Sequence, residues 1–298
     1  MHAHGHPHVH PINKNNKEKN ILVAASLNFS FVIVEIIAWV LTNSVAILSD
    51  ALHDFGDSIA LFSAYFAEKS ARKPKDSKRT FGYARISIFS ALFSALVLGL
   101  GSLYILFEAV QRLFNPQTVS SLGMILVACV GITINALGCM RLKQGRSLNE
   151  KVLSWHLLED VMGWCAVLVS GIIIFFTHWF IVDSLLTVAY TLFILYGVSK
   201  NLKPIFNILL QGVPENIDVE VIKKEILELN FVTDVHDIHV WSLDGEKSIF
   251  TAHITVSGTE SILVIKKSVR DILFHHNINH STIEYERSEE CKDGVCAF

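Results

Sequence analysis

Six long apolar segments constrain the fold more than any other feature of the sequence. A bilayer core about 30 Å thick is crossed by about 20 apolar residues in a helix. Residues 86–107 and 122–140 hold no charged side chain, and further apolar stretches lie at residues 20–49, 51–67, 152–176 and 179–199. We therefore predict six transmembrane helices, with a break between the last two at residues 177–178. The alternative, a large soluble core of buried helices, would not need so many such runs.

Basic residues in the short connections predict the orientation. Lysine and arginine gather before the first apolar segment, in the second and fourth connections, and after the sixth segment. Such residues mark the cytoplasmic side, so we expect a multi-pass membrane protein with both termini in the cytoplasm. The first 20 residues have histidine and asparagine where a signal peptide has its apolar region, so the first segment is expected to stay as an anchor.

Charge divides the chain into two parts. Residues 1–203 hold seventeen basic and twelve acidic residues, whereas residues 204–298 hold eight basic and sixteen acidic ones. We predict a His-rich cytoplasmic tail at 1–19, a membrane domain at 20–203, a cytoplasmic domain at 204–290 and a Cys-containing tail at 291–298. The net charge of −3 argues against nucleic-acid binding. A Gly-rich phosphate-binding loop is absent from the sequence, so ATP is not an expected partner.

The C-terminal part alternates between helical and strand patterns. Apolar residues recur at helical spacing in 215–229, and residues 235–243 and 248–256 read as strands joined by the turn signal Asp244-Gly245. A second helix is expected at 261–274 and a third strand at 282–285. The order α-β-β-α-β predicts a small α+β sandwich with its helices on one face of the sheet.

Two apolar segments carry the same ionisable pattern. His53 and Asp57 are four residues apart in the second segment, and His156 and Asp160 are four apart in the fifth. Residues at this spacing share one face of a helix. Two imidazoles and two carboxylates would form a tetrahedral set suited to Zn²⁺, and the same donors admit Co²⁺, Ni²⁺, Fe²⁺ and Mn²⁺. Alternatively, the His and Asp of each pair only hydrogen-bond to each other and help to hold neighbouring helices together.

We do not assign five other polar residues of the apolar segments to the metal site. We expect Asp54 and Glu159, on different faces from the pairs, to lie at the membrane edge or to face water. Asp183 is also expected to meet water. Glu35 and Asn135 are either hydrogen-bond partners between helices or groups that line a route.

The donor set favours transport over catalysis. A metalloprotease would place His-Glu-x-x-His on a helix, and neither histidine cluster has that pattern, so an enzyme is not expected. Metal binds deprotonated imidazole and carboxylate, so binding releases protons. A site that exchanges metal for protons on opposite sides of a membrane is an antiporter, with histidine a suitable proton carrier.

Four segments resemble the cation diffusion facilitator family. They are residues 43–57, 78–85, 156–160 and 235–243, and the likeness runs in order through residues 20–290. The resemblance implies six transmembrane helices, a ferredoxin-like cytoplasmic domain, a homodimer, and efflux of a divalent metal coupled to proton entry. Members with His and Asp on both helices typically prefer zinc, which points to His53, Asp57, His156 and Asp160 as the transport site.

The resemblance also implies metal ligands in the cytoplasmic domain. It maps them onto His236, His253 and Glu286, with His280 as a further candidate, although spacing alone would read these as ordinary surface residues. Cys291 and Cys296 either bind zinc or belong to an unstructured tail. The alternating histidines at positions 2, 4, 6, 8 and 10 are either a metal-gathering tail or a plain polar one.

The resulting hypothesis is a Zn²⁺/H⁺ antiporter that exports cytoplasmic zinc by alternating access. Zinc is its substrate and a regulatory ion, and protons are the counter-ion. One alternative is the same antiport for Co²⁺, Fe²⁺, Ni²⁺ or Mn²⁺. A second is a membrane metal sensor that does not transport. The compact loops favour the bacterial inner membrane.

Overall fold

A computed structural model describes residues 14–71, 73–142, 148–257 and 262–287. Within these ranges, the side chains at the start of the first and fifth helices are not described. The packing of the chain separates two compact units, Met1–Phe66 with Ser90–Lys200, and Ala67–Phe89 with Asn201–Phe298. Each unit is considered by itself below.

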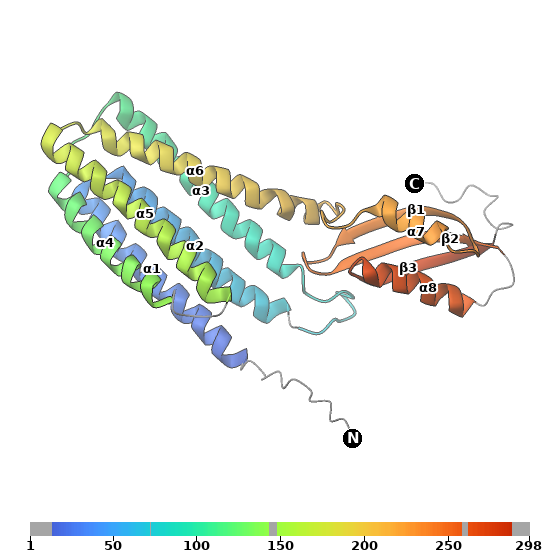
Figure 1. Cartoon of the computed structure of the whole chain (residues 1–298). Helices are drawn as coiled ribbons and strands as arrows, with labels where there is room; N and C mark the ends of the chain where they lie inside the picture. The colour runs from blue at the N-terminus through green and yellow to red at the C-terminus, as the bar shows by residue number, and fades with distance from the viewer. Residues whose placement is uncertain (1–13, 72, 143–147, 258–261, 288–298) are drawn as a thin grey trace, which may run out of the picture. The chain divides into compact units, whose positions relative to one another are not determined.

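Six long helices follow one another in the first part of the described chain, and Figure 1 shows them running side by side as a bundle. Their bounds are α1 Lys14–Thr42, α2 Val45–Ala71, α3 Ile86–Phe114, α4 Ser121–Leu142, α5 Leu148–Thr177 and α6 Ile181–Leu209. Each overlaps one predicted apolar segment, but the first segment was predicted to run to residue 49, whereas α1 ends at Thr42 and α2 begins at Val45. Of the described residues, α3, α6 and Leu157–Thr177 of α5 are long and apolar enough to cross a membrane.

The prediction of six spans is therefore supported in part. Shorter apolar stretches lie in α1, at Asn28–Thr42, and in α4, at Ser121–Leu137. Helix α2 is 27 residues long, but it carries three aspartates within eight residues, at positions 50, 54 and 57. Polar groups inside a bundle lower the mean hydropathy of a helix without changing its length. This explains why α2 is long enough to cross a membrane but not apolar enough to be recognised as a membrane span.

Helix packing depends on small residues at close approaches. Helix α4 packs along α5, and α1 packs against α4. A Cβ added at Gly131 of α4 would overlap the indole of Trp164, a residue of α5 that is almost fully buried. Glycine at this point allows the two backbones to approach closely, as small residues do in membrane bundles.

Left-handed residues mark two of the turns between helices. Asn43 has φ 57° between α1 and α2, and His178 has φ 58° between α5 and α6. Asparagine tolerates this conformation better than most residues. The second turn falls at the predicted break, residues 177–178.

The C-terminal part folds into one small sheet with two helices. Its elements are α7 Val219–Leu227, β1 Val232–Ser242, β2 Ser248–Val256, α8 Ile262–His275 and β3 Ile278–Arg287. Strand β2 is central, antiparallel to β1 and parallel to β3. The predicted α-β-β-α-β order is confirmed. Gly245 adopts φ 95° in the hairpin, as its turn signal predicted.

The predicted bounds of α7, β1 and β3 were wrong, and β1 begins at Val232 rather than at Val235. Helix α7 begins after Asp218 rather than at Glu215, because the Asp218 carboxylate accepts hydrogen bonds from the backbone N–H groups of Glu220 and Val221. Such a cap fixes where a helix starts. The third strand is longer than predicted, because parallel pairing with β2 extends along the whole of β3.

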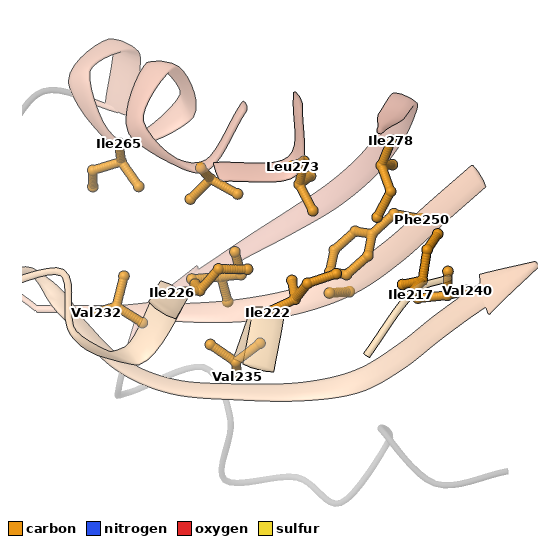
Figure 2. Packing of buried hydrophobic residues seen from close by; sticks show 13 residues of the cluster. Ile217, Ile222, Ile226, Val232, Val235, Val240, Phe250, Ile265, Leu273 and Ile278 are labelled. Atoms are coloured by element: carbon orange, nitrogen blue, oxygen red, sulfur yellow. The ribbon is translucent and has the colours of Figure 1, made fainter. Parts of the chain in front are cut away.

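The apolar core of this domain lies between the helices and one face of the sheet. Figure 2 shows α7 and α8 directing apolar side chains at β1, β2 and β3. Val235, Phe250 and Ile254 of the strands are fully buried there. Because side chains alternate along a strand, their neighbours in sequence lie on the opposite face, which is free of these helices.

Candidate metal centres

The second helix brings the first predicted pair together. His53 Nε2 lies 3.8 Å from Asp57 Oδ2, as four-residue spacing on a helix predicts. Both side chains are partly exposed. The His53 ring also contacts the Tyr190 ring of α6 edge to face, with centroids 6.3 Å apart. The pair therefore faces a neighbouring helix rather than the outside of the bundle.

The fifth helix supplies the second carboxylate. Asp160 is only 6% exposed, and the part of α5 that follows it, from residue 161 to 177, carries no charged side chain. The Tyr190 hydroxyl has Asp160 as an electrostatic neighbour, together with Asp50, Asp54 and Asp57 of α2. Asp50 of α2, Gly163 of α5 and Tyr190 of α6 line the same small cavity, so α2 and α5 meet beside this tyrosine. His156 lies on α5, but its side chain is outside the described residues, so its part in the set stays a prediction.

Sequence reasoning overlooked Asp50 and misplaced Asp54. Both are buried, Asp54 with 5% of its surface exposed, so the expectation that Asp54 faces water was wrong. Asp50 also borders a small cavity of about 30 Å³ between α2, α5 and α6. The signal was available in the sequence, because Asp50 precedes Asp54 by four residues and therefore shares its helix face.

The remaining polar residues of the apolar segments differ in burial and in hydrogen-bond partners. Glu159 is exposed, as expected. Asn135 donates to the carbonyl of Gly131 in its own helix, so this contact does not join helices. Asp183 is 1% exposed and bonded to the start of α2, which overturns the expectation that it meets water. Glu35 is also 1% exposed, and the one side chain within hydrogen-bonding reach of its carboxyl group, among the described residues, is that of Asp50.

A second donor cluster lies in the C-terminal α+β domain. His236 of β1, His253 of β2 and Glu286 of β3 each offer a ligand atom, and these atoms all lie within 4.8 Å of one another. His253 Nδ1 is 2.6 Å from Glu286 Oε1, and His236 Nε2 is 3.6 Å from Glu286 Oε2. Two imidazoles and a carboxylate at this separation suit Zn²⁺ with one open position.

Sheet register explains how residues distant in sequence meet. His236 is paired directly with His253 across β1 and β2, and their ring centroids are 5.4 Å apart. All three donors lie on the sheet face opposite the helices, because they alternate with buried core residues. Three strands therefore present one donor each at neighbouring positions.

A bulge in β1 adds carboxylates around this cluster. The register shifts between His236 and His239, and Asp237 adopts φ 51° there. Asp237 Oδ2 lies 3.7 Å from His253 Nε2, while Asp234 Oδ2 lies 2.9 Å from His236 Nδ1. Carboxylates beside ligand imidazoles orient the rings and fix their tautomers. Spacing arguments missed Asp237, because a bulge breaks strand alternation.

The other predicted ligands are not brought into this cluster. His280 pairs with Ile249 nearer the start of β3, and its ring contacts Phe81 with centroids 5.6 Å apart. It lies six residues from Glu286 along an extended strand, about 20 Å away, which is too far to share an ion. Cys291, Cys296 and the N-terminal histidines lie outside the described residues.

Fold and donors together define a class of protein. Long helices, several of them apolar enough to cross a membrane, form a bundle that contains imidazole and carboxylate donors, and a small α+β domain carries a second donor set. This arrangement is that of a membrane transporter of metal cations rather than of an enzyme. Residues 21–210 match the model of the cation efflux transmembrane domain, and residues 214–288 match that of the cation efflux protein cytoplasmic domain. The chain belongs to the cation diffusion facilitator family.

Named relatives are bacterial metal transport proteins. The metal cation efflux system protein CzcD of Cupriavidus metallidurans is 36% identical over 286 residues, which cover 95% of this chain and 90% of the relative. The zinc transporter ZitB of Pectobacterium atrosepticum is 31% identical over 301 residues, covering 99% and 92%. The cadmium, cobalt and zinc/H(+)-K(+) antiporter of Bacillus subtilis is 32% identical over 301 residues, covering 98% and 94%.

Proposed function

We propose that this chain exports zinc from the cytoplasm in exchange for protons. Zn²⁺ binds between α2 and α5 on His53, Asp57, His156 and Asp160. The bundle then opens the site to the other side, where protons displace the metal. In this cycle zinc is the substrate. The exchange for protons drives the transport, so the cycle needs no ATP.

One observation carries the proposal: α2 and α5 meet beside Tyr190. The His53 ring of α2 contacts the Tyr190 ring. A Cβ at Gly163 of α5, three residues after Asp160, would lie 3.5 Å from Asp50 Oδ1 and 3.7 Å from the Tyr190 hydroxyl. Buried carboxylates of like charge are costly unless a cation or a proton neutralises them. A site that alternates between a divalent ion and protons meets this requirement in every state. The names of the relatives, which include zinc transport and an antiporter, support the same reading.

The cytoplasmic cluster is proposed as a regulatory zinc site. Zinc held by His236, His253 and Glu286 would fix three strands on the face free of α7 and α8. A stiffer face favours contact with a second copy of the chain, so we propose a homodimer whose contact is strengthened by zinc. The setting is the bacterial inner membrane, with both termini in the cytoplasm and domains at 20–203 and 204–290.

Reconstituted proteoliposomes test the transport proposal. Purified protein is placed in vesicles with a zinc-sensitive dye inside and an imposed pH gradient. Asp57→Ala and Asp160→Ala are expected to lower zinc flux about tenfold or more, because each removes a charged ligand. Glu159→Gln is the matched control, since this exposed carboxylate neighbours Asp160 in sequence and should leave flux unchanged.

Two outcomes would reject the assignment. Wild-type zinc flux in both aspartate variants would remove the site from the transport path. Flux that is insensitive to collapse of the pH gradient would remove the antiport. Zinc binding without any flux in the wild type would instead favour a membrane sensor.

A wider choice of transported metals is a second candidate, favoured by the names of two relatives. One name combines cadmium, cobalt and zinc, and the other refers to metal cations in general. Competition of Co²⁺, Cd²⁺, Ni²⁺, Fe²⁺ and Mn²⁺ against zinc in the same vesicles separates the two readings. Zinc selectivity predicts weak competition from each of them.

A further inference from the structure

Glu35 lies in an unusual environment for a carboxylate. It sits within the apolar part of α1 and is 1% exposed. No hydrogen bond of regular geometry reaches either carboxylate oxygen among the described residues, but the Asp50 carboxyl group is close enough to form a side-chain hydrogen bond when one of the two acids holds a proton. The charged neighbours that face it are Asp54 and Asp50 of α2 and Asp160 of α5. All three are acidic, so Glu35 is surrounded by its own charge type.

Basic residues that could compensate this charge are scarce in the sequence. Residues 20–68 and 152–199 contain no lysine or arginine, and residues 86–140 contain only Arg112. Arg112 is engaged elsewhere, since its Nε is 2.8 Å from Glu108 and it donates to the backbone carbonyl of Asn43. An ionised carboxylate buried without a cationic partner is strongly unfavourable, and two carboxyl groups can hydrogen-bond to each other only when one of them holds a proton. Glu35 therefore requires a bound cation.

The metal at the transport site does not meet this need alone. One divalent ion neutralises two carboxylates, and the proposed ligands already include Asp57 and Asp160. Glu35, Asp50 and Asp54 would remain. A proton requires no set of ligands at fixed distances, so it suits a single carboxylate whose described neighbours are other acids and apolar side chains.

We propose that Glu35 is a proton-binding site of the transport cycle, separate from the metal ligands. It is protonated while the transport site is empty. When a divalent cation binds near Asp160, the added positive charge favours the ionised form of Glu35, and the O–H bond breaks with release of the proton to water. When the metal leaves, Glu35 takes a proton from the opposite side. This inference rests on the proposed antiport and assigns one of its protons.

Proton counting on the full-length protein tests the proposal. The purified protein is titrated with Zn²⁺ in weakly buffered solution, and released protons are read with a pH dye. Glu35→Gln is a neutral isostere that has no proton to release, so it should release up to one proton per zinc less than the wild type. Glu35→Asp keeps an ionisable carboxyl and should retain the release. Glu159→Gln, at an exposed site, should match the wild type.

Infrared difference spectra supply a direct readout. Zinc addition to the wild type should reduce the carbonyl band of a protonated carboxylic acid, and this loss should be absent in Glu35→Gln. If that variant does not fold, the wild-type spectrum still decides, because an unchanged acid band on zinc binding would overturn the proposal.

Transport separates this inference from the function on which it rests. In vesicles, Glu35→Gln should lose acceleration of zinc uptake by a pH gradient, while uptake down a zinc gradient continues. A wild type without proton coupling would refute the antiport itself. A coupled wild type with an equally coupled Glu35→Gln variant, and equal proton release, would refute the role of Glu35 alone.

Discussion

The carboxylate of Asp183 on α6 accepts a hydrogen bond from the backbone N–H of Val45, the first residue of α2, at 2.8 Å. Its other oxygen accepts from the Ser44 hydroxyl. An acceptor at this position satisfies the free N–H groups at a helix N-terminus. A residue 138 positions away in sequence therefore fixes the start of the helix that carries His53 and Asp57.

Removal of this cap should destabilise the protein. Asp183→Ala leaves buried donors without an acceptor, at a cost of about 1–3 kcal/mol. Thermal unfolding in detergent should show a lower midpoint, with a smaller decrease for Asp183→Asn, which keeps one oxygen acceptor. An alanine variant as stable as the wild type would show that the cap contributes little.

The cytoplasmic cluster predicts a change in the number of bound zinc ions. His253→Ala removes the imidazole that lies 2.6 Å from Glu286 and 5.4 Å, ring to ring, from His236. Equilibrium dialysis of the full-length protein should show one zinc fewer per protomer. His280→Ala is the control, because His280 contacts Phe81 instead. Equal zinc loss in both variants would contradict the three-residue centre.

The loop between α2 and α3 should depend on pH through Asp76. The pKa of Asp76 is lowered by hydrogen bonds from the Tyr83 hydroxyl and from the backbone N–H groups of Arg79 and Lys78. Because the folded pKa lies below the unfolded value of about 3.9, the carboxylate stabilises the loop above that pH. This stabilisation is lost as the pH falls through the folded pKa.

Hydrogen exchange of residues 73–85 at several pH values measures this effect. After correction for intrinsic exchange, protection should decrease on acidification. Tyr83→Phe removes one donor and should raise the pKa of Asp76, so protection is lost at higher pH. Tyr196→Phe, at an exposed site on α6, should leave the profile unchanged. A pH-independent loop in the wild type would contradict the role of Asp76.

Close packing of α4 on α5 predicts a strong effect at Gly131. Gly131→Val places atoms against the Trp164 indole and should cost about 1–3 kcal/mol, as overpacking does. Gly197→Ala on α6 is the matched control, because a Cβ there meets no heavy atom of the described chain within 4 Å. Thermal unfolding should separate the two variants, and equal stability would show that α4 and α5 adjust without cost.

Local features of this protein followed from the sequence. The apolar segments gave the places of α1 to α6, because helix length in a bilayer is set by its thickness. His53 and Asp57 share a helix face because four residues make about one turn. The α-β-β-α-β order followed from apolar periodicity and from Asp244-Gly245.

Tertiary structure decided which polar residues are buried and which of them meet. Asp54 and Asp183 were expected to face water, yet both are buried against other helices. His236, His253 and Glu286 meet through sheet register, whereas His280 on the same strand does not. Spacing within one element fixes a face, but only the packing of elements distant in sequence determines what that face contacts.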